Sequence, residues 1–197
     1  MRFKENKYQV IEKAISYNLA NFIFNYFLLK RDAVAFMYKN NITYDNGMLG
    51  TWTDQQVPNS YSIYGDPVMD TLLMKVLSRM QDDTELSLIP TYSYARLYKQ
   101  GDILKRHKDR PSCEISTTIH LGGDKWPIFI EGNEFLLNIG DMLVYSGCEL
   151  EHWREPFEGE ICGPISIIQD RIIDLTFIPM PYFQGFIIFK HLRTQVF

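Results

Sequence analysis

The chain has 197 residues, of which 46% are hydrophobic and 14% aromatic, and its net charge is −4 at pH 7. The length is typical of a single domain, and the aromatic content excludes a disordered chain. The acidic balance excludes a broadly basic nucleic-acid binder. Three cysteines without a C-x-x-C pair argue against a secreted disulfide scaffold or a zinc ribbon and favour a cytoplasmic protein. We expect neither a signal peptide nor a membrane span, because the apolar stretch at 19–29 is too short to cross a bilayer.

The first 84 residues are expected to form a helical support and a loop region. Residues 10–38 contain neither Gly nor Pro, and apolar residues such as Phe22 and Leu29 recur there at helical spacing. The charged triplet at 30–32 is a candidate division between two helices. This segment is therefore predicted to supply helices that cover one face of the remaining chain.

A turn-rich segment at 40–67 separates these helices from a second helical pattern. Within it, residues 52–60 are a candidate lid, because they are rich in loop-forming residues and precede the core. Asp66 followed by Pro67 has the pattern of an N-cap with proline at the first helical position. This pattern predicts a helix over 68–80.

After residue 85 the apolar residues alternate with a period of two, which predicts β-strands. Strands are expected in 87–102 and 113–123, and short strands separated by Gly-containing turns are expected in 126–147. Short strands at this spacing are typical of an antiparallel sandwich or barrel. The predicted fold class is therefore α+β, with a jelly-roll β core and the N-terminal helices packed on one of its faces.

The C-terminal segment is rich in Ile and Phe and matches no pattern that we expect beside such a core. Pro179 and Pro181 exclude one long helix there, and residues 195–197 look like the opening of a strand that is cut short. The segment is open to three interpretations: strands that complete the barrel, a dimer surface, or a poorly ordered apolar segment. If the closing strand of the core is missing, one sheet edge is exposed. We divide the chain, as one structural domain, into a support (1–84), a catalytic core (85–162) and an atypical C-terminal segment (163–197).

Three residues in the predicted β core have the chemistry of a metal site. His107 and Asp109 are two positions apart on a segment predicted to be extended, so their side chains point to the same side. His152 lies 45 positions further on, where a jelly roll can bring it beside them. Two histidines and one carboxylate on one face of a metal form the facial triad of non-haem Fe(II) oxygenases. Taken alone, His-x-Asp can equally be a solvated surface turn.

A longer ordered pattern surrounds these residues. The sequence from Tyr98 to Asp109 has the form Y-x-x-G-x-x-x-x-x-H-x-D, and a Gly-Asp turn at 140–141 precedes His152. Over about 85–160 the chain resembles the Fe(II)- and 2-oxoglutarate-dependent dioxygenases, in particular small microbial and phage-type members of the prolyl-4-hydroxylase-like branch.

The resemblance implies a double-stranded β-helix in which His107, Asp109 and His152 bind Fe(II), with 2-oxoglutarate and O₂ as cosubstrates. It also implies hydroxylation of an unactivated C–H bond coupled to release of succinate and CO₂. The expected partner is a small-molecule or peptidyl substrate and not a nucleic acid or a membrane. A prolyl side chain is suggested only by the branch, and a free amino acid, another protein side chain or a metabolite remain open. The sequence predicts no oligomeric state.

The resemblance also suggests residues for the 2-oxoglutarate carboxylate. Tyr98 is a candidate donor, or else a packing aromatic, and Thr118 and His120 lie on the strand that normally lines the cosubstrate pocket. His120 can equally be a core histidine. The position where the branch carries its basic residue falls at 161–163, which holds neither Lys nor Arg. Arg154 is the nearest base, or else a surface charge.

Arg171 and Arg193 are remoter candidates for the same role. Two other functions remain open from the sequence. One is a non-catalytic jelly-roll binding or structural module with a vestigial metal site. The other is a different metal-dependent enzyme on a cupin-like barrel. Fe-dependent formation of succinate would separate an oxygenase from both.

Overall fold

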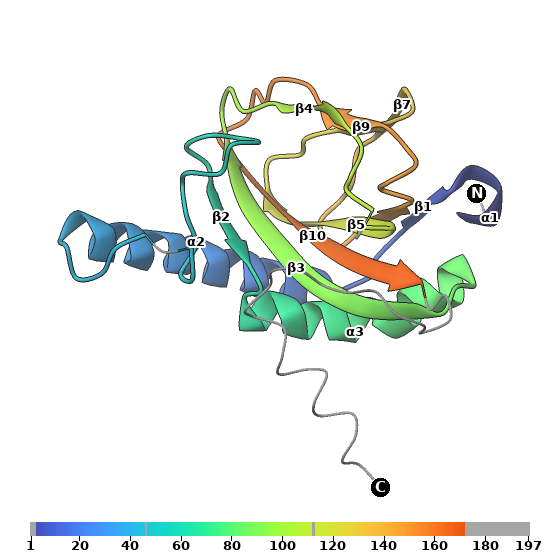
Figure 1. Cartoon of the computed structure of the whole chain (residues 1–197), viewed down its shortest axis with the longest axis horizontal. Coiled ribbons are helices and arrows are strands. Elements are labelled where there is room, and N and C mark those ends of the chain that lie inside the picture. Colours follow the sequence, from blue (N-terminus) through green and yellow to red (C-terminus); the bar gives the residue numbers. More distant parts are fainter. Residues whose placement is uncertain (1–2, 46, 112, 172–197) are drawn as a thin grey trace, which may run out of the picture.

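The computed structural model describes residues 3–45, 47–111 and 113–171. Within these residues three helices accompany ten strands that form two antiparallel sheets (Figure 1). The elements are α1 (Phe3–Asn6), β1 (Tyr8–Ile11), α2 (Tyr17–Lys39), β2 (Tyr61–Tyr64), α3 (Pro67–Thr84), β3 (Leu88–Lys99), β4 (Leu104–His107), β5 (Ile115–Gly123), β6 (Ile128–Ile130), β7 (Asn133–Phe135), β8 (Met142–Tyr145), β9 (His152–Arg154) and β10 (Ile161–Arg171).

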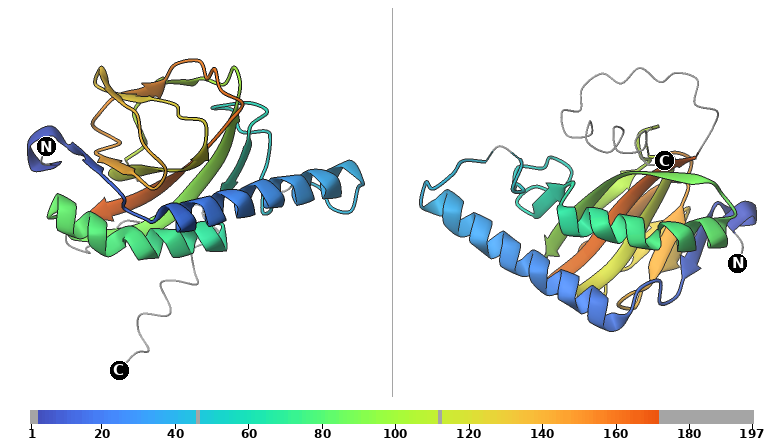
Figure 2. Two further views of the ribbon diagram at one scale, coloured as in Figure 1. Left: turned by 180° about the vertical axis from the view of Figure 1, so that it is seen from behind. Right: turned by 90° about the horizontal axis from the view of Figure 1, so that it is seen from below.

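The two sheets are curved layers that face each other. The larger sheet has the strand order β1-β8-β5-β10-β3-β2, and the smaller has the order β4-β9-β6-β7. Helices α2 and α3 cross the outer face of the larger sheet (Figure 2, right), where α2 contacts β5 and α3 contacts β3. The predicted α+β class, with a jelly-roll core and helices on one face, is confirmed. None of the described helices combines the length and the apolar character needed to cross a membrane.

Helix α2 differs in three ways from the sequence prediction. The helical pattern begins at Tyr17, because Ser16 caps the helix by accepting a hydrogen bond from the backbone N–H of Leu19. Residues 8–11, which lie before the helix, form β1, and this strand pairs with β8. The triplet at 30–32 does not divide the helix, and Phe22 and Leu29 are exposed. The buried stripe follows the 3.6-residue period and consists of Ala20, Ile23, Phe24, Phe27 and Val34.

Helix α3 begins where the sequence predicted. The Asp66 carboxylate accepts hydrogen bonds from the backbone N–H groups of Val68, at 2.9 Å, and Met69, at 3.3 Å. Pro67 occupies the first turn, where no partner for its missing N–H is needed. The helix continues four residues past the predicted end, to Thr84, and stops at Glu85 in the left-handed conformation.

Strand β10 is a central strand that the sequence left as one of several possibilities. It lies between β3 and β5 and pairs antiparallel with both, so that Ile165 is opposite Ala95 on one side and Ile119 on the other. Of the alternatives that the sequence left open for this segment, a strand that completes the core is therefore the one found for residues 163–171. The boundary expected at 162/163 falls inside β10. A register shift between Cys162 and Pro164 accommodates the proline, which cannot donate to the ladder. The expectations for Pro179, Pro181 and 195–197 fall outside the described residues.

The short strands of the core agree with the sequence prediction. Strands β6 and β7 form a hairpin with Ile130 opposite Asn133. The two turn residues, Glu131 and Gly132, have φ angles of 48° and 84°. Positive φ at both positions is the type I′ geometry that matches the twist of a two-residue hairpin.

Candidate metal centre and its cavity

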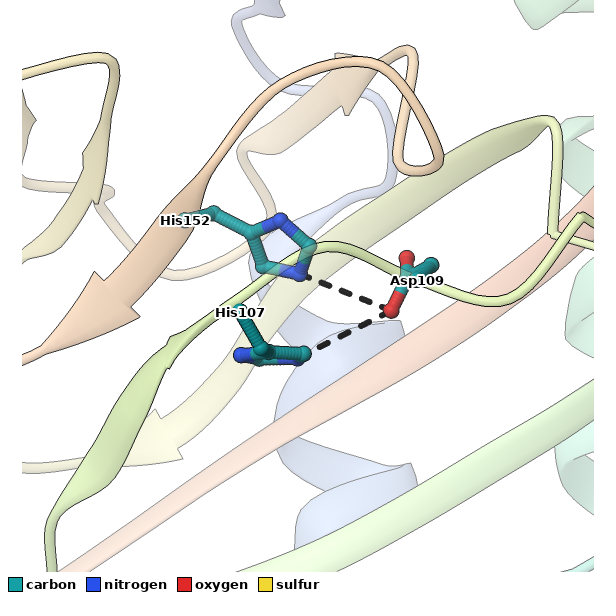
Figure 3. Close-up of side chains that lie close together, drawn as sticks. All are labelled: His107, Asp109 and His152. Atoms are coloured by element: carbon teal, nitrogen blue, oxygen red, sulfur yellow. Dashed lines mark ion pairs between the residues drawn. The ribbon is translucent and has the colours of Figure 1, made fainter.

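The three predicted ligands lie close together where β4 ends and β9 begins in the smaller sheet (Figure 3). His107 ends β4 and lies opposite His152, the first residue of β9, while Asp109 follows two positions after His107. Nε2 of His152 lies 3.5 Å from Asp109 Oδ1, and Nε2 of His107 lies 3.7 Å from the same oxygen. One ligand atom from each of the three side chains lies within 4.8 Å of the others. The fold therefore assembles the trio from segments that are 45 residues apart.

Both imidazoles are held in the same tautomer by the backbone. Nδ1 of His107 lies 2.7 Å from the carbonyl oxygen of Lys105, and Nδ1 of His152 lies 3.1 Å from that of Leu150. A carbonyl oxygen only accepts, so each Nδ1 carries the proton and each Nε2 presents a lone pair. A hydrogen bond of this kind from the non-ligating nitrogen is the usual support of a metal-bound histidine.

Asp109 is oriented as firmly as the histidines. Ser116 Oγ donates to its Oδ2 at 2.6 Å, which turns Oδ1 toward the two imidazoles. The Asp109 backbone N–H donates to the carbonyl of Gly147 at 2.9 Å. A Cβ at position 147 would lie 2.3 Å from Asp109 Oδ2 and 2.4 Å from Ser116 Oγ. Any larger residue at 147 would therefore force this carboxylate or Ser116 to shift.

The protonation states of Asp109 and His107 favour the binding of a cation. Burial alone would raise the pKa of Asp109, but the neighbouring His152, the hydrogen bond from Ser116 and the neighbouring His107 outweigh it, so the pKa of this carboxyl is lowered. Burial, and then the neighbouring His152, lower the pKa of His107. At neutral pH the site therefore presents one carboxylate and a neutral His107, which are the forms that bind metal.

The donor set fits a divalent transition metal. Two imidazole nitrogens and one carboxylate oxygen on one side of a site leave further positions open, which is the arrangement used for non-haem Fe(II). In the part of the chain that the structure describes, no other group of three His, Cys, Asp or Glu side chains lies close enough to hold an ion.

A cavity of about 360 Å³ opens beside the trio, at the small end of the range for ligand sites. Three of the four residues predicted for the cosubstrate, Tyr98, Thr118 and Arg154, line it. The fourth, His120, is not among the lining residues. It is 5% exposed, and its Nδ1 lies 4.0 Å from Cys162 Sγ.

Arg154 is buried and not a surface charge, being 4% exposed. It shares the extended strand β9 with His152, two residues earlier, so both side chains point to one side. Its Nη1 donates to the carbonyl of Trp126, and the guanidinium lies 5.0 Å from the centre of that indole. Tyr98 packs edge-on against the same indole, with ring centres 4.8 Å apart.

His120 is kept neutral by its surroundings. Burial, and then the positive charges of Arg154 and Lys125, lower its pKa to about 4. Its Nε2 has no hydrogen-bond partner among the described residues. Of the remoter candidates, Arg171 is the last residue of β10 and Arg193 lies outside the described residues.

Sequence reasoning missed Arg96 as a part of the site. This side chain is 2% exposed and lines the cavity together with Asp54 and Gln56 from the segment predicted as a lid. The alternation of Tyr94, Arg96 and Tyr98 on β3 was visible in the sequence and places all three on one face. That alternation could have indicated Arg96.

The sequence matches no family model and no curated protein. Solved structures match the fold. A Pseudomonas putida prolyl-4-hydroxylase matches with a TM-score of 0.56 at 15% identity, over 84% of this chain and 93% of that one. HygX from Streptomyces hygroscopicus, with nickel and 2-oxoglutarate bound, matches with a TM-score of 0.59 at 11% identity, over 87% and 85%. The non-haem α-ketoglutarate-dependent epimerase SnoN from nogalamycin biosynthesis matches with a TM-score of 0.63 at 10% identity, over 86% and 79%.

These likenesses show that the chain has the fold of the Fe(II)- and 2-oxoglutarate-dependent oxygenases, as the sequence pattern predicted. The matched proteins include a prolyl hydroxylase and an epimerase, so proteins with different reactions share this fold. The reaction of this chain must therefore be argued from its own residues.

Proposed function

We propose that this protein is an Fe(II)- and 2-oxoglutarate-dependent oxygenase that hydroxylates an unactivated C–H bond. The observation that carries the proposal is the trio of His107, Asp109 and His152, assembled in a fold shared with such oxygenases and opening into a cavity. A vestigial site would not be expected to keep both histidine tautomers and the Asp109 carboxylate in the orientation that a metal requires.

Each cofactor has residues that fit it. Nε2 of His107, Nε2 of His152 and a carboxylate oxygen of Asp109 would hold Fe(II). When bound, Fe(II) and 2-oxoglutarate supply the O₂ activation that releases succinate and CO₂ and inserts one oxygen atom into a C–H bond. The buried wall of the cavity, which includes Ile128 and Tyr145, would exclude water from that chemistry.

Arg154 is our candidate for the distal carboxylate of 2-oxoglutarate. None of the ion pairs formed by the described residues includes Arg154. A buried cation without a carboxylate partner is costly, so an anion that enters the cavity would relieve this cost. The carboxylate would also meet the hydroxyl groups of Tyr98 and Thr118, which line the same cavity. His120 would lie behind the residues that line the cavity, where its neutral form avoids repulsion of Arg154.

The size of the cavity supports a small substrate group. The 360 Å³ must hold 2-oxoglutarate as well as the reacting part of the substrate. A single amino-acid side chain, prolyl or other, or a small free molecule fits this condition better than a large rigid one. We therefore propose that the reaction is hydroxylation of an amino-acid side chain, either peptidyl or free, rather than epimerisation of a bulky product.

The proposal is tested by adding Fe(II) and 2-oxoglutarate to the protein without O₂. We expect a weak visible charge-transfer band that His107→Ala abolishes, and Fe-dependent formation of succinate once O₂ is admitted. A protein that binds no metal would contradict the proposal. Metal binding without any response to 2-oxoglutarate would favour a different metal-dependent enzyme, and the absence of succinate would favour a non-catalytic module.

A further inference from the structure

Asp54 and Gln56, in the loop between α2 and β2, bind the buried Arg96 beside the metal centre. Nη2 of Arg96 lies 2.9 Å from Asp54 Oδ1. Gln56 Oε1 accepts hydrogen bonds from both terminal nitrogens of Arg96, at 3.2 and 3.1 Å. Tyr94 donates to the other oxygen of Asp54 at 2.8 Å. A fully buried guanidinium therefore fixes the direction of the Gln56 amide.

The opposite end of that amide faces a metal ligand. A guanidinium has only donors, so the oxygen of Gln56 must face Arg96 and its NH₂ group must face away. The amide nitrogen lies 3.1 Å from Nε2 of His107. Because Nδ1 of His107 donates to the carbonyl of Lys105, Nε2 has no proton and accepts from Gln56. The Gln56 amide thus occupies the lone pair of His107 Nε2, to which a metal ion would bind.

The amide and a metal ion compete for this lone pair. A metal–imidazole bond is about 2.1 Å long, whereas the amide nitrogen already lies 3.1 Å from the same atom. Val57 is buried and the ends of the loop are tied by backbone hydrogen bonds between Thr51 and Ser62. The competition is therefore relieved by a shift of the Gln56 amide nitrogen away from Nε2 of His107, about the oxygen that Arg96 holds, rather than by opening of the loop.

We propose that Gln56 is a positioning residue of the metal centre. It caps Nε2 of His107 in the metal-free protein and yields that lone pair to the metal. With its oxygen still held by Arg96, it then donates its NH₂ group to an oxygen ligand bound beside His107. The identity of that oxygen ligand, from 2-oxoglutarate, rests on the proposed function. The competition for His107 does not.

The competition is tested by calorimetric titration of Mn²⁺ into the chelator-treated full chain. Gln56→Ala should bind Mn²⁺ about three- to tenfold more tightly than the wild type, because one competing hydrogen bond is removed. The neighbouring Gln55 is also exposed and makes no hydrogen bond to His107 among the described residues, so Gln55→Ala is the matched control and should bind as the wild type does. Unchanged or weaker binding by Gln56→Ala would overturn the proposal.

The donation to an oxygen ligand is tested by repeating the titration with N-oxalylglycine, an unreactive stand-in for 2-oxoglutarate. This compound should tighten Mn²⁺ binding more in the wild type than in Gln56→Ala, which lacks the NH₂ donor. Equal tightening in both proteins would refute the donation. No tightening in the wild type would contradict the proposed function instead, and the titrations without N-oxalylglycine would still decide the competition.

Discussion

Replacement of His120 by leucine should change how the stability of the metal-free protein depends on pH. The pKa of His120 is lowered from 6.5 to about 4, first by burial and then by Arg154. The unfolded chain therefore takes up a proton at a higher pH than the folded chain, and stability falls as the pH falls from 6.5 toward 4. The difference of two and a half pH units corresponds to a loss of about 3.5 kcal/mol, at about 1.4 kcal/mol per pH unit.

The assay is urea unfolding of wild type and His120→Leu at several pH values from 8 to 4.5, with a chelator present. As the pH falls, the free energy of unfolding of the wild type should decrease relative to that of the variant. The difference between the slopes of the two free energies against pH should correspond to about one proton. A difference between the two proteins that is the same at every pH would refute the reasoning. Since His120 does not line the cavity, the variant should also keep the wild-type affinity for 2-oxoglutarate at pH 8.

Three further substitutions test the site. Ser116→Ala removes the donor to the ligand carboxylate and should weaken Mn²⁺ binding about 10- to 100-fold, and unchanged affinity in a titration would contradict its role. Gly147→Ala places a Cβ 2.3 Å from the same carboxylate, so metal affinity and melting temperature should both fall, and an unaltered variant would refute the steric argument. Arg154→Gln should raise the 2-oxoglutarate concentration needed for succinate formation, whereas the exposed Arg106→Gln should not. Equal cosubstrate dependence would discard Arg154.

The elements that the sequence predicted well are those with local signals. The start of α3 depends on Asp66 and Pro67, which act within one turn, and the β6–β7 hairpin depends on its two turn residues. Strand β10 was left as one of several possibilities because Gly163 and Pro164 interrupt its alternation. Its place in the sheet is decided by pairing with β3 and β5, whose paired residues are at least 39 positions away along the chain.

The same contrast holds at the metal centre. The His-x-Asp spacing of His107 and Asp109 is a local signal, and the resemblance supplied His152. The hydrogen bonds that Gln56 accepts from Arg96 and donates to His107 join residues 40 and 51 positions apart. They depend on how a loop packs against a strand, which no spacing in the sequence encodes. The burial of Arg154 was likewise visible only in three dimensions.

The central claim is that His107, Asp109 and His152 bind a metal that 2-oxoglutarate then chelates. The most direct measurement is a crystal structure of the full chain with Mn²⁺ and N-oxalylglycine. The account predicts one ion bound by Nε2 of both histidines and an oxygen of Asp109, with N-oxalylglycine on the ion and its distal carboxylate on Arg154. An ion held elsewhere, or N-oxalylglycine bound away from the ion, would contradict it.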